Sequence, residues 1–253
     1  MDPLARFALT DRVAIVTGAS SGLGVHAAVG LAAAGADLVL VARRADRLEE
    51  TRAQVEATGR RCVVVVGDVA EPATAGRATE AALEAFDRVD VLVNNAGIGT
   101  AVPATHETPE QFRKVIDINL EGSYWMAQAC GRVMPPGSSI INISSVLALT
   151  TAGLPQAAYA SSKAAIIGLT RDLAVQWTGR KGIRVNAIAP GFFESEMTEQ
   201  YPDGYLDAMR GRIPAGRKGE PEEFVSAVVF LASEASSYVT GITLPVDGGI
   251  IAT

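Results

Sequence analysis

Seven short, largely apolar runs recur along the chain, and stretches long enough to form helices separate them. The runs are residues 13–17, 37–42, 62–67, 89–94, 139–144, 183–189 and 242–247. They do not alternate between apolar and polar residues, so we expect strands that are covered on both faces. The helix-length segments are roughly 22–34, 46–58, 72–86, 109–134, 156–179 and 221–232. This order predicts an α/β fold, a doubly wound parallel sheet of about seven strands with right-handed crossovers.

The composition is that of an ordinary globular domain. The 253 residues are 48% apolar and 20% charged, which allows one sizeable core. No linker, repeat or low-complexity segment divides the chain, so we expect a single domain spanning residues 1–253. The formal net charge is −6 and no strong basic cluster is present, which argues against a nucleic-acid partner.

Neither a signal peptide nor a membrane span is predicted. The opening residues, MDPLARFALTDR, contain acids and no apolar core segment. The most apolar stretch, 27–42, is interrupted by Gly35 and Asp37, which favours a helix end followed by a strand. We therefore expect a cytoplasmic protein with no membrane partner.

The two cysteines, Cys62 and Cys130, are far apart and have apolar neighbours, so we expect buried thiols in a reducing compartment. The histidines are His26 and His106, and no set of residues has the spacing of a zinc site. No metal is expected.

A glycine-rich segment joins the first predicted strand to the first predicted helix. In VAIVTGASSGLG the glycines are Gly18, Gly22 and Gly24. A loop of this kind lets backbone N–H groups approach a pyrophosphate at the positive end of the helix. The spacing is G-x-x-x-G-x-G rather than G-x-G-x-x-G, but its place in the first βα unit favours a dinucleotide site in a Rossmann-type fold.

The same loop also matches G-x-S-x-G, the nucleophile elbow of serine hydrolases, with Ser20 as the nucleophile. That chemistry needs a histidine base late in the chain. His106 precedes three of the seven predicted strands, and no histidine follows it. The dinucleotide interpretation is therefore preferred.

The end of the second predicted strand bears on the choice of cofactor. An acid at this point binds the ribose 2′-hydroxyl of NAD, whereas an arginine accommodates the 2′-phosphate of NADP. The chain has Ala42 in the acid's position, followed by Arg43 and Arg44. Since guanidinium groups bind phosphate in bidentate fashion, NADP(H) is preferred, with NAD(H) as the alternative.

Tyr159 and Lys163 lie four apart in YASSK. On a helix these positions share a face, so the phenol and the ammonium could act on the same bound group. The spacing alone is weak evidence for a catalytic pair, because such pairs arise by chance.

Taken in order, the motifs make the chain resemble the short-chain dehydrogenase/reductase family over essentially its whole length, in its single-domain, 3-oxoacyl or carbonyl reductase-like branch. The motifs that carry the resemblance are TGASSGLG (17–24), Asp68-Val69, NNAG (94–97), DINLEG with Asn119, NISS with Ser145, YASSK, Pro190-Gly191 and VDGG (246–249).

The resemblance implies a set of site residues. The catalytic residues would be Asn119, Ser145, Tyr159 and Lys163. Cofactor contacts would come from Gly18, Ser20, Ser21, Gly22, Leu23, Gly24, Arg43, Arg44, Asp68, Val69, Asn95, Ala96, Gly97, Pro190, Gly191, Phe193 and Ser195, together with Tyr159 and Lys163. The substrate would contact Ser145, Val146, Leu147, Leu154, Phe192 and Met197.

The implied chemistry is physically reasonable. A free tyrosine has a pKa of about 10 and is a poor base at neutral pH. The charge of Lys163, with an oxidised nicotinamide nearby, would favour the phenolate, so that Tyr159 could exchange a proton with the substrate oxygen. Ser145 would donate a hydrogen bond to that oxygen. The resemblance adds that Lys163 holds the nicotinamide ribose and that Asn119 supports a proton relay.

Two features depart from the common pattern. Ser145 precedes Tyr159 by 14 positions, one more than expected, which leaves Ser144 as the near alternative for the catalytic serine. Pro135-Pro136 stand before the fifth strand, where carrier-protein reductases often have basic residues, so docking of a carrier protein is doubtful.

The substrate end is only outlined by the sequence. The stretch 192–216 mixes aromatic, acidic, Pro and Gly residues and is predicted to be a lid. Its apolar residues, with those of 146–158, favour an apolar or mid-sized ketone.

We therefore expect an NADP(H)-dependent oxidoreductase that interconverts a ketone and a secondary alcohol, with a 3-oxoacyl-thioester or carbonyl reductase first. A polyol or sugar-acid dehydrogenase is the alternative on the same machinery. A non-catalytic nucleotide sensor is the alternative of another class, although a sensor has no need of the four catalytic residues. The substrate would be a small molecule, and the resemblance implies a homotetramer.

Overall fold

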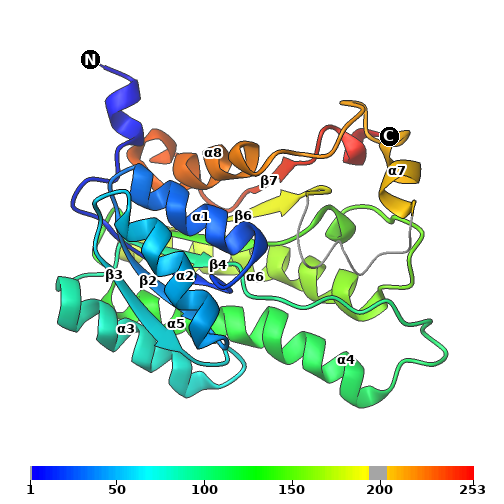
Figure 1. Ribbon diagram of the computed structural model, residues 1–253, viewed down its shortest axis with the longest axis horizontal. Coiled ribbons are helices and arrows are strands. Elements are labelled where there is room, and N and C mark those ends of the chain that lie inside the picture. The colour runs from blue at the N-terminus through cyan, green and yellow to red at the C-terminus, as the bar shows by residue number, and fades with distance from the viewer. Residues whose placement is uncertain (1, 194–203) are drawn as a thin grey trace.

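The computed structural model describes residues 2–193 and 204–253. Within them, parallel strands form one seven-stranded sheet in the order β3-β2-β1-β4-β5-β6-β7 (Figure 1). The strands are β1 Val13–Thr17, β2 Asp37–Ala42, β3 Cys62–Val66, β4 Val91–Asn94, β5 Ser139–Ile143, β6 Arg184–Pro190 and β7 Thr243–Val246. The strand order reverses between β1 and β4, which confirms the doubly wound, Rossmann-type sheet predicted from the sequence.

Helices cover both faces of this sheet (Figure 1). On one face lie α1 Gly22–Ala33, α2 Ala45–Glu56 and α8 Pro221–Ala232. On the other lie α3 Pro72–Phe86, α4 Pro109–Ile116, α5 Gly122–Val133 and α6 Ala157–Lys181. A short helix, α7 Tyr205–Arg210, lies beyond the carboxyl end of β6.

Each face of the sheet has its own apolar core. Along β1, Ala14 and Val16 join the core under α1 and α8, whereas Val13 and Ile15 join the core under α3 and α5. Successive side chains of a strand point to opposite faces, so a strand covered on both sides must be apolar throughout. The same pattern explains why the predicted strands lacked alternation.

The predicted helix 109–134 is interrupted in the structure. Thr108 begins α4 with a capping box shared with Gln111. After α4, a π-helical turn at Asp117–Glu121 leads into α5. Such turns often occur at functional sites, and this one carries Asn119.

Both cysteines are free and buried, as the sequence predicted. Burial raises the pKa of each thiol to about 12. In the described part of the chain, no helix has the length and apolar character needed to cross a membrane.

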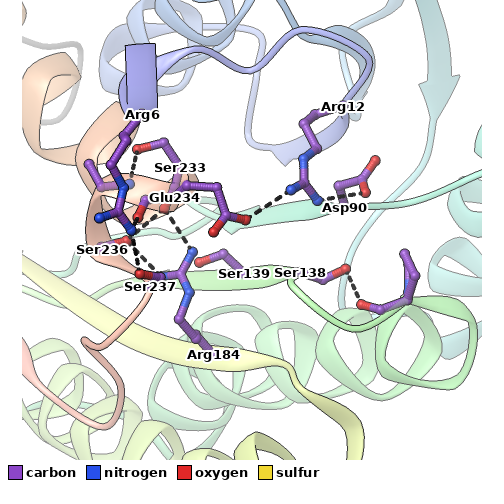
Figure 2. A network of polar contacts seen from close by, with 12 residues as sticks. Arg6, Arg12, Asp90, Ser138, Ser139, Arg184, Ser233, Glu234, Ser236 and Ser237 are labelled. Atoms are coloured by element: carbon purple, nitrogen blue, oxygen red, sulfur yellow. Dashed lines mark hydrogen bonds and ion pairs between the residues drawn. The ribbon is translucent and has the colours of Figure 1, made fainter. Parts of the chain in front are cut away.

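The amino-terminal edge of the sheet is held by a polar network (Figure 2). Arg184, at the start of β6, is buried and donates to the carbonyls of Leu231 and Ser233 at the end of α8 (2.9 and 3.1 Å). Arg12 bridges Asp90 and Glu234 at 3.2 and 3.0 Å. This edge lies opposite the carboxyl ends of the strands, where ligands bind in open α/β sheets.

Candidate active site

A cavity of about 710 Å³ opens at the carboxyl ends of the strands, a volume within the range of small-molecule and cofactor sites. Most of the predicted cofactor residues line it, namely Gly18, Ser20, Ser21, Gly22, Leu23, Arg43, Arg44, Asp68, Val69, Asn95, Ala96, Gly97, Tyr159, Lys163, Pro190, Gly191 and Phe193. Of the predicted substrate residues, Ser145, Val146, Leu147 and Phe192 line the same cavity and Leu154 does not. Ser195 and Met197 lie outside the described residues.

The glycine loop packs directly against the segment that follows β4. Gly18 has a φ of +65°, and a Cβ on it would lie 2.8 Å from Ala96 Cα and from Asn95 Nδ2. The Asn95 amide in turn donates to the carbonyls of Thr17 and Gly18 (3.0 and 3.3 Å). A Cβ on Gly24 would collide with the Gly18 carbonyl. Only glycines allow this close packing. Gly18 and Gly22 of the loop also line the cavity.

The start of α1 fits an anionic group. Ser21 precedes the helix, and within the described residues neither its side chain nor an acid in the first turn occupies the helix end. The first N–H groups of a helix lack intrahelical partners, and they carry partial positive charge. Together with the glycine loop, this end fits the pyrophosphate of a dinucleotide.

The end of β2 fits an additional phosphate. Ala42 is buried, whereas Arg43 is exposed and lies 3.6 Å from the Asp68 carboxylate, an ion pair of little strength. The Arg44 guanidinium donates weakly to the side chain and carbonyl of Ser20 (3.3–3.4 Å). Two guanidinium groups thus flank the cavity where an NAD-type site would have a carboxylate.

Tyr159 and Lys163 meet on the first turns of α6. Both are buried, with 7% and 4% of their surface exposed, and the Lys163 Nζ lies 5.7 Å from the centroid of the Tyr159 ring. The Nζ donates to the Ile143 carbonyl at the end of β5 (2.7 Å). Burial lowers the pKa of Lys163 from 10.5 to about 8, because a low-dielectric surrounding disfavours the ammonium.

The two serines after β5 have different surroundings. The Ser144 hydroxyl donates to the Lys163 carbonyl (2.8 Å) and is buried. The Ser145 hydroxyl accepts from the Leu147 N–H (3.1 Å), which leaves its own proton for a group in the cavity. This geometry favours Ser145 over Ser144 as the donor to a substrate oxygen.

Asn119 is fully buried behind the cavity rather than on its wall. Its amide oxygen accepts from the Ile98 N–H (2.8 Å), and its nitrogen donates to the Ile98 carbonyl (3.0 Å) and to the Ser162 hydroxyl (2.9 Å). The π-helical turn thereby connects the segment after β4 to α6. A Cβ on Gly97 would lie 3.2 Å from Asn119 Oδ1 and 3.4 Å from Lys163 Nζ. Both groups therefore lie close to Gly97, where a larger residue would crowd them.

The substrate end of the cavity is bordered by an apolar cluster. Val146 and Phe192 pack in it with Met209, Ile213 and Ile250. The Tyr205 hydroxyl on α7 donates to the Ala152 carbonyl (2.6 Å). Residues 204–213 of the predicted lid are therefore attached to the loop that follows β5.

The sequence did not predict a buried polar network near the site, although one of its members, Asn94, belongs to the NNAG motif. The Asn94 amide donates to the Ser123 carbonyl and to Asn142 Oδ1 (3.0 and 2.9 Å), and Asn142 donates to Thr170 (2.9 Å). This buried network joins β4, β5, α5 and α6 beneath the cavity. The available signal was that Asn94 and Asn142 are polar residues within predicted strands that are otherwise largely apolar. A buried polar group requires hydrogen-bond partners, so these positions could have indicated a buried network.

Comparison with known proteins agrees with this geometry. A family model described as enoyl-(acyl carrier protein) reductase matches residues 18–251. The chain is 38% identical over 249 residues to gluconate 5-dehydrogenase of Gluconobacter oxydans (strain 621H), covering 96% of each chain. It is 41% identical to galactitol 2-dehydrogenase (L-tagatose-forming) of Cereibacter sphaeroides, covering 98% of each.

A third relative is the 3-oxoacyl-(acyl-carrier-protein) reductase of Thermotoga maritima, 37% identical over 96% of this chain and 99% of the relative. Among solved structures, a gluconate 5-dehydrogenase from Burkholderia cenocepacia J2315 in complex with NADP and tartrate is 35% identical. It covers 100% of both chains with a TM-score of 0.92. Fold, motifs and relatives agree, and this protein belongs to the short-chain dehydrogenase/reductase family of NAD(P)-dependent oxidoreductases.

Proposed function

We propose that the protein is an NADP(H)-dependent dehydrogenase that interconverts a secondary hydroxyl group of a polyol or sugar acid with the corresponding ketone. The observation that carries this proposal is the identity of 38–41% over nearly full length to gluconate 5-dehydrogenase and galactitol 2-dehydrogenase. The sequence motifs alone favoured a 3-oxoacyl-thioester or carbonyl reductase. The relatives support the polyol or sugar-acid alternative better, although one of them is a 3-oxoacyl reductase.

The preference for NADP(H) rests on charge at the end of β2. Arg43 is exposed and only weakly paired with Asp68, so its guanidinium can turn to a 2′-phosphate at little cost. Arg44 stands beside Ser20 of the glycine loop. The buried Ala42 places no carboxylate there to repel a phosphate.

Tyr159 is the proposed proton-transfer residue. In the oxidising direction its phenolate would take the proton of the substrate hydroxyl, and in the reducing direction the phenol would return it to the carbonyl oxygen. The Ser145 hydroxyl would donate to the same oxygen, where negative charge develops. When bound, the nicotinamide supplies the hydride acceptor or donor.

Lys163 supports Tyr159 through charge and position. Its ammonium lies close to the phenol ring, and a positive charge favours the phenolate. We propose that Lys163 also holds the nicotinamide ribose and that Asn119 supports a proton path to it. The hydrogen bonds of Asn119 to Ile98 and Ser162 support a second role, which is to hold α6 against the segment after β4.

The proposal can be tested with three substrates. Oxidation of galactitol and of gluconate is followed by NADPH formation, and reduction of a 3-oxoacyl thioester by NADPH consumption. We expect kcat/KM for a polyol or sugar acid to exceed that for the thioester by at least about tenfold, or ~1.4 kcal/mol of transition-state binding. The reverse order would favour the 3-oxoacyl reductase, for which the apolar border of the cavity is the supporting observation.

A further inference from the structure

The end of β5 and the first turns of α6 are joined by two hydrogen bonds that run in opposite directions. The Lys163 side chain donates to the main chain of β5, at the Ile143 carbonyl (2.7 Å). The Ser144 side chain donates to the main chain of α6, at the Lys163 carbonyl (2.8 Å). Both bonds are buried, so neither competes with water.

This pair of bonds lies between the groups proposed to act on the substrate. Ser145 follows Ser144 directly and lines the cavity, with an extended backbone (φ −163°, ψ 155°). Tyr159 lies one helical turn before Lys163 on the same face of α6. The bond from Ser144 to Lys163 therefore joins the segment that carries Ser145 to the turns of α6 that carry Tyr159 and Lys163.

Ser144 is itself held on the strand side. Its N–H donates to the Ile188 carbonyl of β6 (2.7 Å), and 2% of its surface is exposed. A carbonyl oxygen has two lone pairs, so Lys163 can accept from Ser144 and still accept within its helix. The hydroxyl thus connects two rigid elements without breaking either.

We propose that Ser144 is a positioning residue, which holds the Lys163 turn of α6 against β5. Because the Lys163 ammonium is itself bonded to β5 at Ile143, a shift of this turn would move the ammonium relative to the Tyr159 phenol on the same helix. This inference rests on the proposed function, because it concerns the residues proposed for proton transfer. Without the Ser144 bond, the turn is anchored to β5 by the Lys163 side chain, which the proposed function also assigns to the nicotinamide ribose.

Ser139, at the other end of β5, provides a matched control. It is fully buried, and its hydroxyl donates to a helix carbonyl, that of Leu231 in α8, at 2.7 Å. Ser139→Ala therefore removes the same kind of bond from the same strand, far from the cavity. Thermal unfolding should show a similar loss of stability for Ser139→Ala and Ser144→Ala.

The kinetic expectation differs between the two variants. Ser144→Ala should lower kcat about 10–100-fold, because small displacements of catalytic groups have effects of this size. The rate of alcohol oxidation rises with pH as the general base loses its proton. A displaced Lys163 stabilises the phenolate less, so the midpoint of this profile should move to higher pH, by about 0.5–1 unit. Ser139→Ala should keep the wild-type kcat and midpoint.

A second readout does not need a substrate. The ultraviolet absorbance of tyrosinate, titrated for each protein and for its Tyr159→Phe derivative, isolates the ionisation of Tyr159 by difference. Its midpoint should move to higher pH in Ser144→Ala. Ser144→Cys, which keeps a weaker donor, should give an intermediate midpoint and stands in for the alanine variant if that variant does not fold.

The outcomes separate the two proposals. Wild-type tyrosinate midpoints in both Ser144 variants, with only the loss of stability seen for Ser139→Ala, would overturn the positioning role. A wild-type protein that oxidises no polyol or sugar acid, but shows the predicted shifts of the tyrosinate midpoint, would overturn the substrate assignment and leave the role of Ser144 standing.

Discussion

Lys163 shows how one buried side chain couples the chemistry of the site to the stability of the fold. Burial lowers its pKa from 10.5 to about 8. Between these values the unfolded chain binds a proton that the folded protein has released, so raising the pH across this window stabilises the fold. Below about pH 8 both states are protonated, and the folded protein bears the full cost of the buried ammonium.

Lys163→Met removes that titrating group, and the cofactor-free protein should respond in a pH-dependent way. We expect the stability of the wild type to rise relative to that of the variant between about pH 8 and 10.5 and to show no relative change from pH 6 to 7.5. Urea unfolding of both proteins at a series of pH values measures this difference. If the difference in the free energy of unfolding between wild type and variant is the same at every pH, burial does not lower the pKa of Lys163. Turnover of the variant should fall about 10²-fold or more.

At the same scale, Arg43 is the residue proposed to select the cofactor. Its weak pairing with Asp68 means that Arg43→Ala should hardly change stability, whereas loss of a charge-assisted bond to phosphate costs about 1.5–3 kcal/mol. We expect the Kd for NADPH to rise about 10–100-fold and that for NADH to change about twofold or less. Arg52→Ala, an exposed arginine of α2 paired with Glu56, is the control. Equal weakening of both cofactors would contradict the assignment.

At the scale of secondary-structure elements, the amino-terminal edge of the sheet depends on Arg184 (Figure 2). Its guanidinium satisfies the last carbonyls of α8, at Leu231 and Ser233, and donates to the Ser236 hydroxyl (2.7 Å). Burial lowers the pKa of this group, a sign that the charge is held at a cost. The benefit is that the end of α8 has partners although it is buried.

Arg184→Met should therefore destabilise the protein by about 1–3 kcal/mol, because the carbonyls of Leu231 and Ser233 lose a charged donor and keep only hydroxyl donors such as Ser236. Activity at 25 °C should stay near that of the wild type, since this edge lies opposite the cavity. Arg6→Ala removes an exposed arginine that donates to Glu234 and Ser237 in the same network, and it should cost less than about 1 kcal/mol. Chemical denaturation compares the two, and equal effects would show that burial of Arg184 is not what matters.

The elements themselves were largely predictable from the sequence, and the exceptions have physical causes. Strands such as β1 and β2 were found at their observed bounds, because burial on both faces demands continuous apolar runs. The π-helical turn at Asp117–Glu121 was not found, since it inserts into a helix without a break in the apolar pattern. The glycine loop could be recognised in the sequence because the positive φ of Gly18 and its close contact with Ala96 require glycine there. The link from Ser144 to Lys163 joins residues 19 positions apart, and no local pattern encodes it.

At the scale of the whole molecule, the site draws on both halves of the sheet. The glycine loop and the two arginines follow β1 and β2, whereas the serines and the pair on α6 follow β5. The cavity spans the point between β1 and β4 where the strand order reverses, which is where this class of sheet binds ligands. The residues proposed for proton transfer thus lie on one half of the sheet, and those proposed for cofactor selection lie on the other.

The expected homotetramer stays a prediction at this scale. Val175 on α6 and Tyr238, between α8 and β7, are apolar side chains that are almost wholly exposed. Multi-angle light scattering of the full chain should give a mass about four times the 26.3 kDa of one chain. A mass of one chain at micromolar concentration would contradict the prediction.

The most direct test of the central claim compares the wild type with Tyr159→Phe. Oxidation of galactitol and gluconate with NADP⁺ and binding of NADPH are measured for both proteins. We predict that the wild type turns over at least one of the two substrates. The variant should lose about 10²–10⁴-fold in kcat, with the Kd for NADPH within about threefold of the wild type. Undiminished turnover by Tyr159→Phe would contradict the account, because proton transfer would then not depend on this phenol.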